Sequence, residues 1–244
     1  METNTHAVVI DRLTKTYRSK AGSVPALRDV TYAFPRGSFT AVMGPSGSGK
    51  STLLQCAAGL DRPTSGRVLL GDTDLSTLNP ARLTKLRRAR MGFVFQAYNL
   101  LPSLSAYENV ALPLRLAGAR PQRKEIRDVL HRVGLSDMGR RRPAELSGGQ
   151  QQRVAVARAL ATKPEVLFAD EPTGALDTGT SRQIMGLLQQ AKEQGGQTVV
   201  MVTHDPSAAA YADIVVFLED GQIAGTLRGA GAGEIAAAMS ELEN

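Results

Sequence analysis

The sequence has a single cysteine, Cys56, and no apolar run long enough to cross a membrane. One cysteine can form neither an intramolecular disulfide nor a cysteine-based zinc site, so a reducing compartment is expected. The longest apolar stretches, such as Thr198–Val202 and Ile214–Leu218, fall far short of the roughly 20 residues that a membrane helix needs. The first residues lack the basic and then apolar pattern of a signal peptide. These absences predict a cytoplasmic protein that reaches a membrane only through another subunit.

The composition is that of an ordinary globular domain. Of the 244 residues, 42% are hydrophobic and 21% are charged, which excludes a wholly disordered chain. The net charge of +6 suits nucleic acid, nucleotide phosphates or an anionic membrane surface, and it selects none of them.

Short apolar runs alternate with helix-like segments along most of the chain. This alternation predicts an α/β fold with right-handed crossovers. We expect strands at Val8–Ile10, Thr31–Phe34, Phe39–Met43, Arg67–Leu70, Phe93–Phe95, Val166–Ala169, Thr198–Val202 and Ile214–Leu218. We expect helices at Lys50–Ala58, Gln152–Ala161 and Ser181–Glu193.

The stretch from about Ala97 to Arg142 has no convincing strand. Its helix candidates, Ala106–Ala117 and Gln122–Val133, predict a helical insertion in the α/β core. After Leu227 the chain is rich in glycine and alanine, which fits either an amphipathic helix or a frayed end.

A glycine-rich segment after the run Phe39–Met43 matches the pattern GxxxxGK[ST] and opens the helix that starts at Lys50. Its glycines let backbone N–H groups converge on phosphate oxygens, and the helix start adds its positive dipole end. Lys50 is expected on the β- and γ-phosphates, and the Ser51 hydroxyl on Mg²⁺. The residues expected around the phosphates are Gly44, Pro45, Ser46, Gly47, Ser48, Gly49, Lys50, Ser51 and Thr52.

Two adjacent carboxylates, Asp170 and Glu171, follow the apolar run Val166–Ala169. By itself this pattern is equally typical of a solvated strand end. Together with the phosphate loop it predicts that Asp170 holds the Mg²⁺ shell and that Glu171 is the general base that polarises the attacking water.

A second anion-binding helix start is predicted where Ser147 and two glycines precede a helical run. One nucleoside triphosphate needs only one such cradle. The second is therefore expected to serve a nucleotide bound to another protomer. Its residues are Leu146, Ser147, Gly148, Gly149 and Gln150.

With these motifs the chain resembles the ATP-binding subunit of ABC transporters from about Val8 to Leu227. The resemblance is strongest to the group that serves macrolide exporters, lipoprotein-release complexes, antimicrobial-peptide transporters and the cell-division pair. The matching segments are Gly44–Leu54, Gly92–Gln96, Asn99–Pro102, Glu108–Val110, Glu145–Arg153 and Ala169–Gly174.

The resemblance implies a P-loop NTPase (RecA-like) core with a small antiparallel β-subdomain and an inserted α-helical subdomain over about residues 97–157. It implies one ATP-binding domain over residues 1–228, followed by a tail over 229–244. It also gives roles to single residues: Gln96 in the Mg²⁺ and water network, Asp177 at the dimer interface, His204 as a catalytic contact to the γ-phosphate, and Tyr17 stacked on adenine.

The implied partners are a second copy of the chain in the ATP-bound state and an integral-membrane permease, with no specific nucleic acid. The implied location is the inner face of the cell membrane, and the implied transport is export or extraction of a lipophilic or peptide-like substrate. A soluble ABC ATPase acting on DNA or ribosomes lacks support, because the chain has neither a long coiled-coil insertion nor a second such domain. A subunit that signals through its membrane partner, as in the cell-division pair, stays open.

Overall fold

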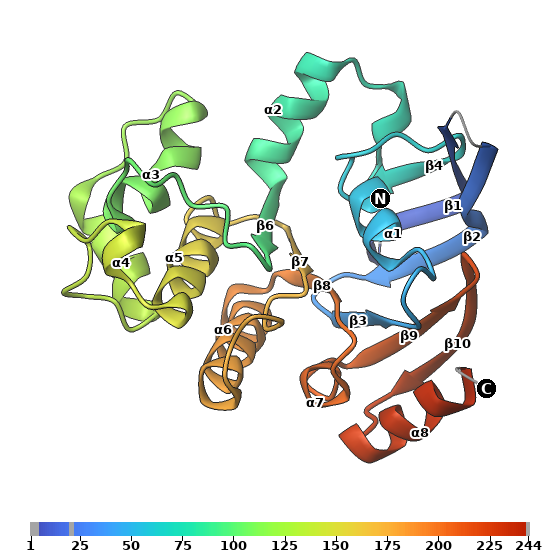
Figure 1. The fold of residues 1–244 in the computed structure, drawn as a ribbon. Helices are drawn as coiled ribbons and strands as arrows, with labels where there is room; N and C mark the ends of the chain where they lie inside the picture. Colours follow the sequence, from blue (N-terminus) through green and yellow to red (C-terminus); the bar gives the residue numbers. More distant parts are fainter. Residues whose placement is uncertain (1–4, 20–21, 243–244) are drawn as a thin grey trace. The chain divides into compact units, whose positions relative to one another are not determined.

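The computed structural model describes residues 5–19 and 22–242. The chain divides into two compact units (Figure 1). The first unit contains residues 1–83 and 198–244, and the second contains residues 84–197. Each unit has its own sheet strands and helices.

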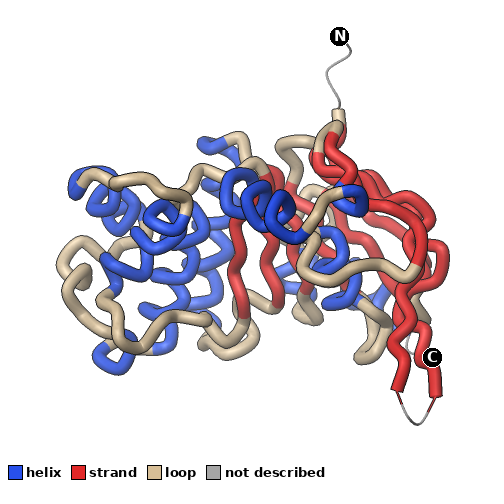
Figure 2. Tube along the Cα trace, turned by 90° about the horizontal axis from the view of Figure 1, so that it is seen from above, coloured by secondary structure: helices blue, strands red, loops and turns tan. Residues whose placement is uncertain are grey.

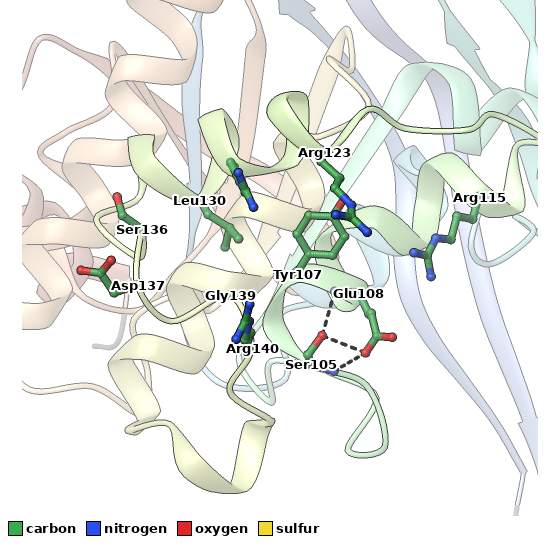
Figure 3. A pocket seen from close by; sticks show the side chains of 11 residues that line it. Ser105, Tyr107, Glu108, Arg115, Arg123, Leu130, Ser136, Asp137, Gly139 and Arg140 are labelled. Atoms are coloured by element: carbon green, nitrogen blue, oxygen red, sulfur yellow. Dashed lines mark hydrogen bonds between the residues drawn. The ribbon is translucent and has the colours of Figure 1, made fainter.

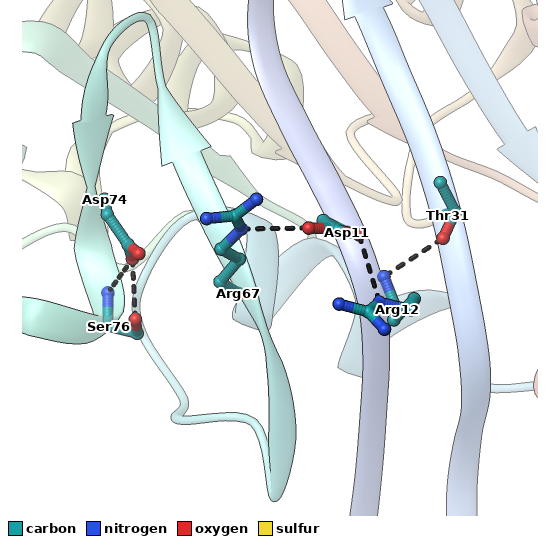
Figure 4. A network of polar contacts seen from close by, with 6 residues as sticks. All are labelled: Asp11, Arg12, Thr31, Arg67, Asp74 and Ser76. Atoms are coloured by element: carbon teal, nitrogen blue, oxygen red, sulfur yellow. Dashed lines mark hydrogen bonds and ion pairs between the residues drawn. The ribbon is translucent and has the colours of Figure 1, made fainter.

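The first unit contains a four-stranded antiparallel sheet in the order β2-β1-β4-β5. Its strands are β1 (His6–Ser19), β2 (Gly22–Pro35), β4 (Ser65–Leu70) and β5 (Thr73–Asp74). The long strands β1 and β2 run side by side (Figure 2). Polar contacts tie β1 to both neighbours: Arg67 on β4 donates to Asp11, and the Arg12 backbone donates to Thr31 on β2 (Figure 4).

Four further strands of the first unit lie in the order β10-β9-β3-β8. They are β3 (Phe39–Met43), β8 (Thr198–Val202), β9 (Ile214–Glu219) and β10 (Gln222–Arg228). β3 pairs in parallel with both β8 and β9, and every residue of β3 and β8 is buried. Burial on both faces explains why these strands are unbroken apolar runs in the sequence.

The helices of the first unit are α1 (Lys50–Ala57), the 3₁₀ turn Leu75–Thr77, α7 (Pro206–Ala209) and α8 (Ala232–Leu242). α1 packs against β8 and against β1. α8 buries Ile235 and Met239 and packs against α7 and β9 (Figure 1). Of the two alternatives for the residues after Leu227, the structure therefore has the helix.

The second unit contains one parallel strand pair and most of the helices. β6 (Met91–Phe95) pairs with β7 (Val166–Asp170). α5 (Gly148–Leu160) packs against β6, α3 (Ala106–Leu116), α4 (Arg123–Arg132) and α6 (Thr178–Gly195). The 3₁₀ turn Pro143–Glu145 precedes α5, and the division between the units falls inside α2 (Pro80–Arg90).

The predicted α/β fold with an antiparallel β-subdomain and a helical insertion is confirmed. All eight predicted strands and both helices of the insertion are present, and no strand lies between residues 97 and 142, all of which are described. α2, β5, α7 and β10 were not predicted. No helix among residues 5–19 and 22–242 is both long and apolar enough to span a bilayer.

Candidate nucleotide-binding site

The phosphate loop lies between β3 and α1 in the first unit. Its last glycine, Gly49, is the N-cap of α1 and has φ 99°, and neither a capping side chain nor an acidic first turn occupies the helix start. The first N–H groups of a helix have no partner within the helix. Together with the positive end of the helix dipole, they favour an anion at this position.

Glycine is required at position 49 because the loop presses against β2. A Cβ atom there would lie 2.3 Å from the carbonyl oxygen of Ala26, far inside van der Waals contact. Beside it, Ser48 is 4% exposed, and its buried Oγ has no hydrogen-bond partner among residues 5–19 and 22–242. Buried hydroxyls are normally hydrogen-bonded. A phosphate oxygen would supply the acceptor that Ser48 lacks.

The Lys50 side chain folds back over this loop. Its Nζ donates to the carbonyl oxygens of Gly44 at 2.8 Å and Pro45 at 2.7 Å. Ser51 and Thr52 occupy the first turn of the same helix. The structure thus places the ammonium group and two hydroxyls around one helix start, as the motif predicts.

His204 lies at the same edge of the sheet as the phosphate loop. Val42 of β3 is in register with Val202 of β8, so Gly44 and His204 each come two residues beyond the paired positions. His204 is exposed, while Thr203 before it is buried and donates its backbone N–H to Val42. This position suits the predicted contact to the γ-phosphate. The role itself stays a prediction.

In the second unit, Asp170 ends β7 and Glu171 follows with φ 48°. A positive φ is unusual for a residue with a side chain, and such strain is concentrated at functional sites. Gln152 of α5 holds the turn: its Nε2 donates to the Pro172 carbonyl at 2.6 Å. The backbone around the predicted general base is therefore fixed by a buried side chain that the motif analysis did not single out.

Gln96 lies beside the same turn. It follows Phe95, which is paired with Asp170 across β6 and β7. A Cβ atom on Gly174 would lie 2.9 Å from Gln96 Nε2, so the amide packs directly on the backbone of that glycine. The structure thus brings together the three residues predicted to act on water and Mg²⁺ in this unit, Gln96, Asp170 and Glu171.

The second predicted anion site is the start of α5. Ser147 is the N-cap, its Oγ accepts from the Gln150 backbone N–H, and Gln150 Oε1 accepts from the Ser147 N–H. The helix was predicted to start at Gln152, but it starts earlier, at Gly148, because the reciprocal capping box at Ser147 and Gln150 begins it there. A hydroxyl that accepts here still has its own proton to donate to an anion.

The start of α6 lies next to the start of α5. A Cβ atom on Gly149 would lie 2.4 Å from Thr180 Cγ2, so only glycine permits this approach. Asp177 caps α6 and accepts from the Thr180 hydroxyl at 2.6 Å and the Thr180 backbone at 3.0 Å. The hydrogen bond from the hydroxyl, with that from the backbone, lowers the pKa of the Asp177 carboxyl. The capping role is a structural finding, while the dimer contact of Asp177 stays a prediction.

Arg158 is a further residue of this site that sequence reasoning missed. Its guanidinium group donates to the carbonyl oxygens of Tyr98 and Asn99, which both have positive φ. It thereby fixes the loop after Gln96 to α5, the helix that begins at Ser147. A lone arginine within a helix gave no local signal, because its partners lie about 60 residues away.

The sequence profile of the ABC transporter family matches residues 27–174. The chain is 43% identical over 222 residues to the uncharacterized ABC transporter ATP-binding protein MJ0796 of Methanocaldococcus jannaschii, covering 88% of this chain and 94% of that protein. It is 45% identical over 220 residues to the macrolide export ATP-binding/permease protein MacB of Syntrophobacter fumaroxidans. That match covers 88% of this chain and only 31% of MacB.

Solved structures agree with the sequence comparisons. A dimeric structure of MJ0796 in a post-hydrolysis state, bound to ADP and Pi, superimposes with a TM-score of 0.85 at 43% identity. The match covers 92% of this chain and 99% of that chain. The family match over residues 27–174 includes the phosphate loop, the start of α5 and the turn at Asp170 and Glu171.

Proposed function

The chain belongs to the ABC transporter family, and from this membership we propose that it is the subunit that binds and hydrolyses ATP to energise a membrane transporter. The observation that carries the proposal is the open start of α1 at Gly49, with the buried and unpartnered Ser48 hydroxyl beside it. These groups offer donors for phosphate oxygens and no competing acid.

The residues of this chain have distinct proposed roles toward ATP. Backbone N–H groups of residues 44–52 hold the phosphates, and Lys50 adds a positive charge to them. The Tyr17 ring, 42% exposed on β1, stacks on adenine. Glu171 accepts a proton from the attacking water, and His204 holds that water against the γ-phosphate.

We propose that Mg²⁺ binds together with ATP, because the residues predicted to hold the ion offer oxygen atoms, the ligands that it prefers. Among the described residues no group of three or more His, Cys, Asp or Glu side chains could hold a metal ion. Mg²⁺ does not need one, since it commonly takes one or two carboxylates and completes its shell with water and substrate phosphates. Ser51, Gln96 and Asp170 offer such oxygen ligands. When bound, the ion neutralises phosphate charge.

We propose that the working unit is a head-to-tail homodimer with two composite sites. Residues 44–51 of one protomer and Ser147–Gln150 of the other enclose each ATP. ATP binds the closed dimer better than the open one and so shifts the equilibrium toward closure. Two solved structures of the relative MJ0796 are dimeric, which supports a dimer as the working unit.

The specific ATPase activity of the purified chain should rise with protein concentration until the dimer is saturated, because a monomer has only half of each composite site. Steady-state phosphate release, measured across a dilution series and compared with the dimer fraction from analytical ultracentrifugation, tests this. Activity that follows protein mass alone at every dilution would contradict the composite site.

We further propose that a separate integral-membrane permease docks on the second unit and holds the chain at the cytoplasmic face of the membrane. A cavity of about 620 Å³ opens between α3 and α4 (Figure 3). Its lining combines Tyr107 and Leu130 with four arginines, Arg115, Arg123, Arg127 and Arg140. In the described part of the chain no hydrogen bond or ion pair occupies these four guanidinium groups.

The charge of this cavity favours an acidic segment of the permease. Of its two acidic residues, Glu108 already accepts from the Ser105 backbone and hydroxyl, both at 2.8 Å. These two hydrogen bonds lower the pKa of the Glu108 carboxyl, and the bond from the backbone has the larger effect. Leu101 and Leu116, at 45% and 55% exposure, are available to apolar side chains of the same partner.

Replacing Arg123 and Arg127 together by Glu should weaken binding of a labelled, glutamate-rich helical peptide by about tenfold or more, because attraction becomes repulsion. Fluorescence anisotropy at two salt concentrations measures this. The matched control is Lys124→Glu with Arg132→Glu, which makes the same charge change on exposed positions of α4 outside the cavity lining. Equal losses in both double variants would contradict a specific site.

The transported substrate is set by the permease rather than by this chain. We propose export of a lipophilic substrate, which the relatives named macrolide export proteins support.

A further inference from the structure

The exposed Tyr17 ring is held by a residue 44 positions further along the chain. Its hydroxyl donates to Asp61 Oδ2 at 2.8 Å. Thr52, in the first turn of α1, lies beside the Tyr17 hydroxyl. An exposed aromatic side chain changes rotamer readily on the nanosecond timescale or faster. These contacts restrict the ring to one orientation.

Lys15 completes this cluster. Its Nζ lies 2.6 Å from Asp61 Oδ1, 2.7 Å from the Arg62 carbonyl oxygen and 4.8 Å from the centroid of the Tyr17 ring. The ammonium group therefore pairs with the carboxylate and faces the aromatic ring at cation–π distance. Burial opposes the charged form of Asp61, but the hydrogen bonds from Lys15 and Tyr17 outweigh it and lower the pKa of that carboxyl.

The segment that carries Asp61 is fixed at both ends. On one side the Leu60 backbone donates to Gln55 of α1 at 2.8 Å. On the other side Thr64 donates its backbone N–H to the Thr14 carbonyl at 2.8 Å and accepts from the Thr16 N–H at 2.9 Å. α1 begins at the phosphate loop, so one short segment connects the phosphate end of the site to the strand that carries Tyr17.

We propose that Lys15 and Asp61 are positioning residues, which hold the Tyr17 ring at a fixed place relative to the phosphate loop so that base and phosphates of a purine nucleotide are bound together. This inference rests on the proposed stacking role of Tyr17. It predicts that the cluster contributes to affinity for the nucleoside part of ATP and nothing to affinity for phosphate alone.

The test compares ATP with inorganic tripolyphosphate, which lacks the base. Asp61→Asn and Tyr17→Phe should each weaken ATP binding about fivefold, the scale of one aromatic stacking contact. Tripolyphosphate binding should not change in either variant. The two substitutions together should cost about as much as one alone, because both act on ATP affinity through the contact between Asp61 and the Tyr17 hydroxyl. Isothermal titration calorimetry measures the affinity of the parent protein, both single variants and the double variant for each of the two ligands.

Asp11→Asn is the matched control, because it makes the same chemical change at another ion-paired carboxylate. Asp11 lies on β1 and pairs with Arg67 at 2.9 Å, outside the cluster (Figure 4). It should leave both affinities unchanged. Melting temperatures of all variants identify any that fail to fold. Tyr17→Phe, which removes only a hydroxyl from an exposed ring, keeps the test valid if Asp61→Asn unfolds.

Two results would overturn the inference. One is an unchanged ATP affinity in Asp61→Asn and Tyr17→Phe, and the other is an equal loss for ATP and tripolyphosphate, which would make the cluster a support of the phosphate loop only. Tyr17→Ala separates a failure of the positioning role from a failure of the stacking role. If Tyr17→Ala also binds ATP normally, the stacking assignment itself is wrong. If Tyr17→Ala alone loses affinity, only the positioning role fails.

Discussion

Glu171→Gln should bind ATP normally and lose at least about 10²-fold in turnover, the effect expected when a general base is removed. The amide keeps the size of the side chain and cannot accept the proton of the attacking water. ATP should then accumulate in the closed state, so the variant should elute as an ATP-dependent dimer in size-exclusion chromatography. Turnover is measured by phosphate release and binding by calorimetry.

Glu193→Gln, an exposed position near the end of α6, makes the same chemical change away from the site and should behave as the parent protein. Glu171 has a positive φ, so a substitution that changed the backbone there would also affect the turn. Because the strained backbone is retained in Glu171→Gln, a loss of turnover reports the carboxylate rather than the turn. Near-normal hydrolysis would remove Glu171 from the mechanism.

The buried strands were predictable because their burial appears directly in the sequence. β3 and β8 are covered on both faces and form continuous apolar runs. The missed elements lack this signal. α2 buries only Leu83 among its residues, and β10 alternates exposed with half-buried positions. Their place in the fold depends on neighbouring elements rather than on their own pattern.

The lengths of β1 and β2 were underestimated for a related reason. The predicted segments, Val8–Ile10 and Thr31–Phe34, cover only one regularly paired stretch, and both strands continue through several register shifts to a second one and to a length of 14 residues each. Irregular pairing breaks the alternation of side chains on which a sequence pattern depends.

The residues of the site also fall into those that the sequence predicts and those that it does not. Segments 44–52, 147–150 and 170–171 were predicted because their chemistry lies in contiguous residues, each at the end of a strand or the start of a helix. Arg158 and Asp61 were missed because their contacts to Asn99 and Tyr17 span 59 and 44 residues. Such contacts exist only in the folded chain, and a single charged residue gives no local pattern.

A mixture of two inactive variants should recover activity if each ATP lies between two protomers. Lys50→Ala removes the phosphate-binding charge from its own half of the site. Ser147→Arg places bulk and charge at the start of α5, where the partner's γ-phosphate must dock. Each variant alone should be inactive, since every site in its homodimer carries the same lesion.

In the mixed dimer both lesions fall in one composite site, and the other site is intact. Random exchange of equal amounts makes half of the dimers mixed, so about a quarter of all sites are restored, and phosphate release should approach about a quarter of the parent rate. The control is Lys50→Ala mixed with a double variant that carries Lys50→Ala and Ser147→Arg on one chain. No dimer of that pair has an intact site, and it should stay inactive. An active Ser147→Arg variant, with activity independent of protein concentration, would show hydrolysis by the monomer and would exclude the composite site on which the transport mechanism depends.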